Sequence, residues 1–586
     1  MINNVLDTAP GERPPLANVG SDASQTSADL AFGAFTSCGP WVVPSTPMPW
    51  QTGLDRIRAR TRAQVPALTK RRALPPGPRL FRTARQVGGA VVMWRLKERK
   101  LGAEASRAGL SRRLRMAFED LGATYIKLGQ IISSGEGIFP PELVSEFRYL
   151  RDRVPAEAFE MVRKTVEEDL GRPLHDVFSS FDPKPIAAAS IAQVHAAVLL
   201  SGESVVVKVQ RPTVGERVQR DLRAMSFFAP HLIGRIPIAA LSNPPALVEL
   251  FAETIVEELD FRLEAQNMLD VGRVLAETGQ RQIVVPRPHP TLVTKRVLVM
   301  ERLHGFPWDD AKGMRDAGID TEAVVKASMV SFLEGAMLHG VFHGDLHGGN
   351  LMVLADGTTA LLDHGITGRL TDAKRQAFLR LMMGGTTNDV RMQVRSLCEL
   401  GALPLDTDID AVIRDLNLDG PVKDPTTMSP DQMINEIRII TKALLGYGAR
   451  MPKELMLYVK DLLFLDGAMA THAPNLDLFA TLTEIAMHFA TQHGQRIAAD
   501  AGIFFDPSSV DISSFKASIG IDPDVDTLTY VELQKRRELI AKRMDGHQTQ
   551  AADALGLRPI SRVSTARSAA KRRLQDRKKA GSRRTS

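Results

Sequence analysis

The sequence predicts an α+β fold of two lobes, with a helical extension in front of a small strand-rich lobe and a large, mostly helical lobe. Apolar residues recur at helical spacing within residues 86–184, for example at Leu114, Phe118 and Leu121. Two short runs rich in β-branched residues, at 204–212 and 296–303, are bounded by turn residues and therefore predict strands. After residue 320 the apolar pattern is again helical. This order of elements suggests a two-lobed enzyme that binds a nucleotide.

These patterns divide the chain into five regions. Residues 1–85 are rich in Pro, Gly and Ser and then in Arg, so we expect a mostly disordered, basic segment with at most a short basic helix. The helical extension covers 86–184 and the small lobe covers 185–302. The large helical lobe covers 303–500, and a basic, largely disordered tail covers 501–586.

The charge of the tail sets it apart from the rest of the chain. Gln534–Ser586 holds 16 Lys and Arg against 4 Asp and Glu, whereas the whole chain has a net charge of +6. A basic segment of this kind can make peripheral contact with an anionic membrane surface. An extension that only adds solubility is the alternative. We predict no specific nucleic-acid partner.

Composition indicates an ordinary globular protein, with 44% apolar and 24% charged residues in a chain of 586. Two isolated cysteines, Cys38 and Cys398, imply neither a disulfide framework nor a Cys-based zinc site. The N-terminus lacks the pattern of a secretory signal, and no uncharged run of 18 apolar residues occurs. We therefore expect a cytoplasmic protein, in peripheral contact with a membrane at most.

Two motifs carry the residues that phosphoryl transfer requires. Such a site needs one carboxylate for the acceptor, together with an amide oxygen and a second carboxylate to hold Mg²⁺. In "HGDLHGGN", Asp345 is followed five positions later by Asn350, which is the spacing of the catalytic loop of kinases. Thirteen residues further on, "ALLDHG" supplies Asp363. Each motif alone is weak, since a lone Asp-Gly is usually a turn. In this order they predict a catalytic Asp345 and a metal site at Asn350 and Asp363.

Lys208 lies in the apolar strand "VVVKV" and needs a partner, because an unpaired ammonium in such surroundings is costly. A single amphipathic helix is predicted over Ala246–Leu269 to provide it. Its acidic residues step by four, three and four positions, so they would share one face: Glu253, Glu257, Asp260 and Glu264. An acidic face turned to solvent is the alternative. We favour cationic partners for these acids.

Taken together, the motifs closely resemble those of the UbiB/AarF family of atypical kinases. The family's KxGQ motif is "YIKLGQIISS", with Lys127, Gly129 and Gln130. Its ExD motif is in "EELDFRLEA", with Glu258 and Asp260, followed by the helix-C glutamate Glu264. An alanine-rich loop stands where ordinary kinases have a glycine-rich one, and its residues are Ala187, Ala188, Ala189 and Ser190. The resemblance runs from about residue 110 to 375.

This resemblance implies a protein-kinase-like fold that binds ATP and Mg²⁺. Lys208 and Glu264 would form the ion pair that orients the nucleotide. Lys127 would pair with Glu258 or Asp260 and lay the extension across the side where a protein kinase admits a peptide. The candidate nucleotide-binding residues are Ala187, Ala188, Ala189, Ser190, Lys208, Met300, Glu301 and Leu303.

The implied function is an ATP-dependent phosphotransferase or ATPase that supports isoprenoid-lipid or quinone metabolism, with an isoprenoid or quinone-like lipid as a partner. A small-molecule kinase of the aminoglycoside or choline type is an alternative, but KxGQ and ExD argue against its open acceptor side. A nucleotide-gated scaffold that binds lipid or protein is another, opposed by the intact Lys208, Asp345, Asn350 and Asp363. Homodimer formation stays open. His347 is expected to bond within its loop, and His195 to pack in the core.

Overall fold

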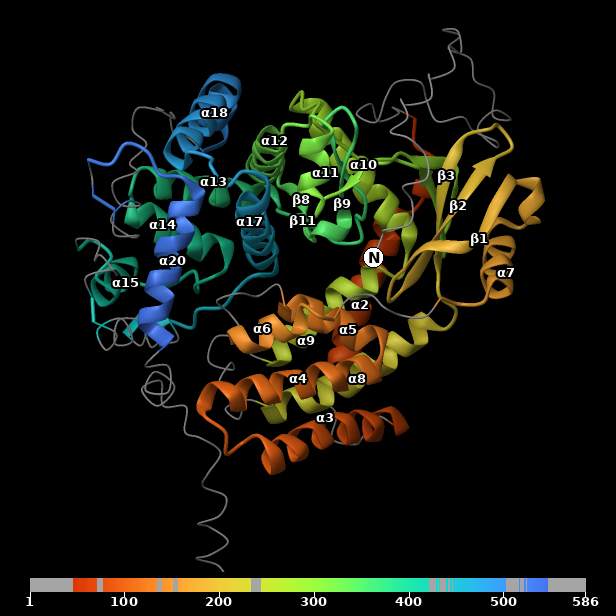
Figure 1. Cartoon of the computed structure of the whole chain (residues 1–586), viewed down its shortest axis with the longest axis horizontal. Helices are drawn as coiled ribbons and strands as arrows, with labels where there is room; N and C mark the ends of the chain where they lie inside the picture. Colours follow the sequence, from red (N-terminus) through yellow and green to blue (C-terminus); the bar gives the residue numbers. More distant parts are fainter. Residues whose placement is uncertain are drawn as a thin grey trace, which may run out of the picture.

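The structure is a computed structural model. It describes residues 46–70, 77–133, 140–150, 156–232, 244–420, 446–501 and 524–545, with isolated positions between 428 and 444 and between 516 and 522. It has the predicted α+β architecture of a helical extension, a sheet-containing lobe and a helical lobe (Figure 1).

The small lobe is built on a five-stranded antiparallel sheet in the order β1-β2-β3-β6-β5. These strands are β1 (Phe178–Ala188), β2 (Ala192–Leu199), β3 (Ser204–Gln210), β5 (Pro288–Val293) and β6 (Val297–Glu301). β3 and β6 confirm the two predicted strands. Because β1 begins at Phe178, the last residues of the predicted helical region 86–184 already belong to the sheet.

Side chains alternate across β3, as the period of two in a strand requires. Val205, Val207 and Val209 are buried in a cluster with residues of α7 (Phe159–Leu170). Lys208 lies on the opposite face, where its Nζ is 5.5 Å from the ring centre of Phe261. The strand thereby directs its lysine toward α10 (Phe261–Glu277).

The predicted single helix over Ala246–Leu269 is wrong, because two helices occupy this region. α9 (Pro244–Glu257) ends before the ExD motif, and α10 begins after it. Asp260 has extended backbone angles, and its carboxylate accepts a hydrogen bond from the Arg262 N–H. Aspartate is a favoured N-cap because it satisfies a backbone donor of the first turn. The break places Glu257 and Glu264 on different helices, so the four acids do not share one helix face.

The extension packs with two helices of the lobes in one hydrophobic cluster. It comprises α2 (Leu54–Thr69), α3 (Pro78–Lys97), α4 (Ala103–Leu121), α5 (Ala123–Ser133) and α6 (Pro141–Phe147). The cluster joins Tyr125 and Leu128 of α5 to Leu222 of α8 (Val214–Leu232) and to Phe251 of α9. Figure 1 shows these helices together below the sheet.

The part of 1–85 that the structure describes is more ordered than the short basic helix that was expected there at most. α2 is a full helix, and its Val65 and Leu68 are 3% and 5% exposed. The short 3₁₀ helix η1 (Pro49–Gln51) precedes it, and η2 (Leu174–Asp176) precedes β1. Residues 1–45 lie outside the described residues.

The large lobe is mostly helical, and short paired strands lie at its junction with the small lobe. Its strands are β4 (Ile283–Val284), β7 (Phe306–Pro307), β8 (Val341–His343), β9 (Leu351–Val353), β10 (Thr359–Leu361) and β11 (Thr367–Arg369). Its helices are α11 (Ala311–Asp316), α12 (Thr321–Glu334), the π-helix η4 (Gly335–His339), η5 (Gly348–Asn350), α13 (Asp372–Thr386), α14 (Val390–Leu400), α15 (Ile409–Leu416), α17 (Lys453–His472) and α18 (Leu478–Ala501).

A further helix, α20 (Tyr530–Asp545), corrects the predicted disorder of 501–586 in part. Tyr530 and Leu533 belong to the core of the large lobe and are 0% and 2% exposed. Residues 546–586 lie outside the described residues, so a disordered tail and its membrane contact stay predictions. No helix in the described ranges combines the length and the apolar character that a membrane span needs.

Candidate active site

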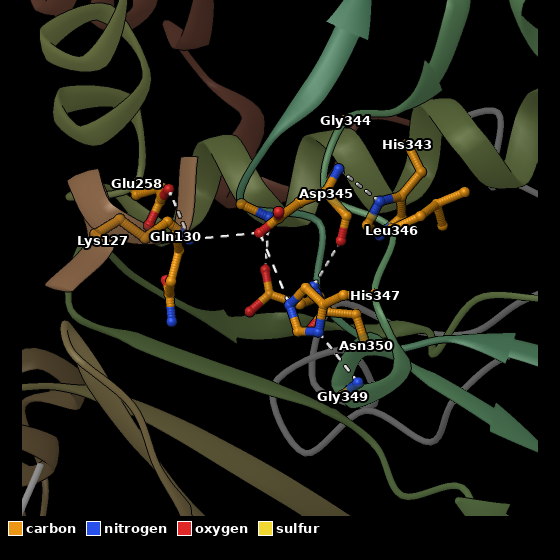
Figure 2. Close-up of polar contacts among 12 residues, drawn as sticks. Lys127, Gln130, Glu258, His343, Gly344, Asp345, Leu346, His347, Gly349 and Asn350 are labelled. Atoms are coloured by element: carbon orange, nitrogen blue, oxygen red, sulfur yellow. Dashed lines mark hydrogen bonds and ion pairs between the residues drawn. The ribbon is translucent and has the colours of Figure 1, made fainter. Parts of the chain in front are cut away.

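The loop that carries Asp345 is fixed through its backbone. The Asp345 N–H donates to His343 Nδ1 at 3.0 Å, and the Leu346 N–H donates to Asp461 Oδ1 at 2.9 Å. Asn350 Nδ2 donates to the Asp345 carbonyl at 3.0 Å (Figure 2). A Cβ at Gly344 would come within 2.9 Å of Ile366, which explains why glycine stands where kinases have arginine. These contacts hold the carboxylate of Asp345 in one place.

Two lysines from distant helices balance the charge of Asp345. Lys127 Nζ on α5 lies 3.4 Å from Oδ2, and Lys460 on α17 forms a close ion pair with Oδ1. His347 Nε2 lies 4.0 Å from Oδ2. Burial alone would raise the pKa of Asp345, but the ammonium of Lys460, followed by that of Lys127, holds it well below its ordinary value. Asp345 is therefore an anion whose charge is balanced by the two lysines. In this arrangement it is a poor proton acceptor.

Lys127 connects the extension to the site. Its Nζ lies 3.3 Å from Glu258 Oε1, so Glu258 is the ExD residue that pairs with it (Figure 2). Asp260 instead forms two hydrogen bonds with the Arg262 guanidinium, at 2.9 and 2.7 Å, and caps α10. The expected pairing is thus present for one of the two alternatives, and the contact with Asp345 adds to it.

The glycine and glutamine of the KxGQ motif make their contacts within the extension. Gly129 is buried, and a Cβ there would lie 2.1 Å from Leu150 Cδ1. Gln130 Nε2 donates to the Leu150 carbonyl at 3.3 Å and does not point at Asp345 (Figure 2). Both residues therefore fix the helix from which Lys127 reaches the site.

Burial changes the acidity of Glu258 despite its lysine. It raises the pKa of Glu258 to about 7, because the carboxylate is desolvated more strongly than Lys127 stabilises it. The usual value is 4.5, so between these two values the folded protein holds a proton that the unfolded chain has released. The contribution of Glu258 to stability therefore falls as the pH rises through this window.

We predict that Glu258→Gln removes this decrease in stability with rising pH. The difference in free energy of unfolding, variant minus wild type, should increase between about pH 5 and pH 7 and level off above, with a limit of about 1.4 kcal/mol per pH unit. Thermal unfolding at a series of pH values measures it. Glu253→Gln, on an exposed part of α9, is the control and should give a flat difference. A flat difference for Glu258→Gln as well would contradict the raised pKa.

Lys208 bonds to two carboxylates from opposite lobes. Its Nζ donates to Glu264 Oε1 at 2.6 Å and to Asp363 Oδ2 at 2.9 Å. Burial lowers the pKa of Lys208, but Asp363 and then Glu264 outweigh it and raise that pKa above its usual value. The expected pair of Lys208 with Glu264 is present, and Asp363 is a second partner.

The hairpin of β9 and β10 brings Asn350 and Asp363 to the same end of the two strands. β9 pairs with β10 so that Leu351 faces Leu361, and the Leu362 N–H donates to the Asn350 carbonyl at 2.9 Å. The Asp363 side chain is 40% exposed, and its Oδ1 accepts the Gly365 N–H at 2.8 Å. Although burial opposes it, Lys208 keeps the pKa of Asp363 below its ordinary range. An ionised carboxylate and an amide oxygen are donors of the kind that fits Mg²⁺.

The alanine-rich loop is a tight turn between β1 and β2. The Ala189 N–H donates to the Ala192 carbonyl at 2.8 Å, and no residue from 187 to 190 has a positive φ. Arg211 Nε donates to the Ala189 carbonyl at 2.9 Å and its Nη1 pairs with Glu157 at 3.0 Å. The loop therefore has a conformation that suits alanine, and the buried Arg211 holds it.

The three candidates at the end of β6 have contacts within the fold. Met300 is 6% exposed in a cluster with Phe261, and Glu301 pairs with Arg287 at 3.0 Å. Leu303 packs against a small cluster around β10. Nucleotide contact by these residues stays a prediction.

The sequence interpretation missed two residues of α17, Lys460 and Asp461. Asp461 is fully buried, and burial raises its pKa well above the ordinary value. Its carboxylate accepts a hydrogen bond from the N–H of Leu346, the residue after Asp345. Lys460 follows Asp345 by 115 positions, so no spacing rule links them. The one available signal was a carboxylate inside the apolar run "YVKDLLFL".

The two histidines expected to have structural roles have them. His347 Nδ1 accepts the Gly349 N–H at 3.1 Å within its own loop. His195 is fully buried and packs against the rings of Phe159 and Phe181.

Known proteins are similar to a large part of this chain. A family model described as the ABC1 atypical kinase-like domain matches residues 149–397. An uncharacterized protein of Mycobacterium tuberculosis is 38% identical over 373 residues, covering 63% of this chain and 75% of the relative. A probable protein kinase UbiB of Pseudomonas aeruginosa is 34% identical over 405 residues, covering 67% and 73%. The solved complex of Rv3197 with erythromycin from Mycobacterium tuberculosis aligns with a TM-score of 0.33 at 21% identity, over 56% of this chain and 89% of that one.

Proposed function

Because this chain belongs to the ABC1 family of atypical kinase-like proteins, we propose that it is an ATP-dependent phosphotransferase or ATPase whose acceptor side is covered by its own extension. The family resemblance inferred from the motifs is confirmed by the relatives named UbiB. The proposal of catalytic activity rests on the geometry of the charged residues in the site.

The nucleotide half of the proposal rests on Lys208. Its ammonium is held by Glu264 at 2.6 Å and by Asp363 at 2.9 Å, and the Glu264 side chain is 3% exposed against 40% for Asp363. Glu264 can therefore keep Lys208 in place while Lys208 exchanges Asp363 for a phosphate oxygen. Asp363 and Asn350 would then hold Mg²⁺, which neutralises phosphate charge when bound.

The observation that carries the proposal is the position of the Asp345 carboxylate between Lys127 and Lys460. In kinases this carboxylate accepts the proton of the acceptor hydroxyl. Here Lys127 would have to withdraw before a hydroxyl could take its place. This arrangement favours a gated site over the open acceptor side of a small-molecule kinase.

We also propose a role in isoprenoid-lipid or quinone metabolism, which the motif resemblance implies. A lipid that binds against the extension and draws Lys127 away from Asp345 would couple lipid binding to turnover. Addition of the lipid to an ATPase assay tests this part separately.

The test of the proposed function is ATP turnover by the full-length protein with Mg²⁺, in the presence and absence of lipid vesicles that contain a phenolic quinone precursor. Asp345→Asn should lose turnover by roughly 10²-fold or more, the usual contribution of a positioned acid or base. Its affinity for ATP should be unchanged, since Asp345 does not bind Lys208. Equal turnover of the variant, or no turnover by the wild type under either condition, would refute the proposal.

A further inference from the structure

A group of metal-ligating side chains lies in the large lobe, outside the kinase-like site. Glu334 at the end of α12 faces His488 and His493 of α18. Both histidines place Nε2 on the same oxygen, Glu334 Oε1, at 2.8 and 2.9 Å. Within the part of the chain that the structure describes, this is the group in which three such ligand atoms lie within 4.8 Å of one another.

Burial of this group shows that it is built into the fold. The Glu334 side chain is 3% exposed, His493 is 13% exposed and His488 is 36% exposed, so the group opens to solvent at His488. Glu334 Oε2 is buried and has no hydrogen-bond partner among the described residues. An unsatisfied buried carboxylate oxygen costs free energy, which a ligand at this oxygen would recover.

The backbone next to Glu334 is also unusual. The π-helix η4 follows it directly, and a Cβ at Gly335 would lie 2.5 Å from the Val341 carbonyl. Single π-turns are rare and occur frequently at functional sites. Arg496 of α18 donates to the Leu338 carbonyl at 2.6 Å and to His339 Nε2 at 3.1 Å. These bonds fix α18 against the π-turn, so the ligands from two helices are positioned in advance.

We propose that Glu334, His488 and His493 bind a divalent transition-metal ion of the Zn²⁺ class. Two imidazole nitrogens and one carboxylate are a common protein ligand set for zinc, which binds them at about 2.0–2.2 Å and leaves a fourth position for water. In the metal-bound state each imidazole would carry its proton on Nδ1, so that Nε2 is the ligand atom. The ion takes the place of the two hydrogen bonds to Glu334 and binds α18 to α12.

The site is independent of the proposed ATP chemistry. Its oxygen and nitrogen donors differ from the oxygen donors Asn350 and Asp363, which suit Mg²⁺. From Glu334 the chain runs through η4 and β8 directly to the loop of Asp345. A metal at Glu334 is thus expected to stabilise the lobe that carries the catalytic loop.

The test is a calorimetric titration of Zn²⁺ into the chelator-treated full-length protein, with excess Mg²⁺ present to occupy the kinase-like site. We expect one Zn²⁺ per chain and a rise in Tm. Co²⁺ in place of Zn²⁺ should give a visible absorption band from histidine coordination. Glu334→Gln and His493→Gln should each weaken binding by more than the roughly 10–100-fold that loss of an outer-shell partner costs.

A second variant of the site and two control variants complete the test. Glu334 is buried and its variant could unfold the lobe, so His488→Gln, at the exposed end of the group, is the second variant and should also lose the ion. His175→Gln, with a side chain 82% exposed, and Asp363→Asn should bind Zn²⁺ as the wild type does. Failure of the wild type to bind Zn²⁺, or equal affinity in the folded variants, which means an adventitious ion only, would overturn the proposal.

Discussion

Replacement of Asp363 by asparagine is expected to abolish magnesium-dependent nucleotide binding and to leave the fold intact. The Asp363 carboxylate is ionised, since Lys208 lowers its pKa, and its side chain is 40% exposed. Asparagine keeps the oxygen that accepts the Gly365 N–H but removes the charge that Mg²⁺ needs. Lys208 retains Glu264, so the small lobe should keep its structure.

Titration of ATP at saturating Mg²⁺, and again with a chelator, measures this effect. The wild type should bind more tightly with Mg²⁺, and Asp363→Asn should bind equally weakly under both conditions. Asp356→Asn is the matched control, because Asp356 lies in the exposed turn of the same hairpin and bonds to the Thr358 N–H. Unchanged affinity in Asp363→Asn would remove Asp363 from the metal site.

Local patterns predicted the parts of the site that depend on short spacings. Asp345 and Asn350 share one loop, and the hairpin that follows brings Asp363 to the same end. Lys208 could be placed because an alternating apolar strand fixes which face its side chain occupies. Its pairing with Glu264 required the family resemblance as well, since 56 residues separate the two.

Helical periodicity failed at the ExD motif for a specific reason. The apolar spacing of α9 continues in α10, so the sequence reads as one helix. The break comes from the Asp260 side chain, which caps α10, and capping competes with helix continuation on a scale of about 1 kcal/mol. Tertiary packing decides such a competition. The break turns Glu258 toward Lys127 rather than along the helix face.

Contacts between distant segments could not be predicted from spacing at all. Lys460 and Asp461 reach the catalytic loop from α17, and neither belongs to a motif. The full length of α2 and the presence of α20 were not predicted, because both helices are rich in charged residues. A few buried side chains hold each helix in place, such as Leu68 in α2 and Tyr530 in α20. Composition predicts disorder only where such burial does not occur.

Lys127→Ala is expected to open the acceptor side of the site. The Lys127 side chain is 16% exposed, and its ammonium contacts both Glu258 and Asp345. Loss of one partner of a buried pair costs roughly 3–5 kcal/mol. The cost should lie at the lower end of this range, because Glu258, with a pKa of about 7, can take up a proton and Asp345 keeps Lys460. The variant should therefore stay folded with a looser extension and a more accessible Asp345.

Transfer of labelled phosphate from ATP tests the covered site most directly, with wild type and Lys127→Ala measured side by side. Lys97→Ala, an exposed lysine on α3, serves as the control and should behave as the wild type does. We predict that Lys127→Ala incorporates more label into itself and into nonspecific acceptors, and that its Tm is lower. Equal incorporation and an unaltered Tm would show that Lys127 does not guard Asp345, and would contradict the account of a site closed by the extension.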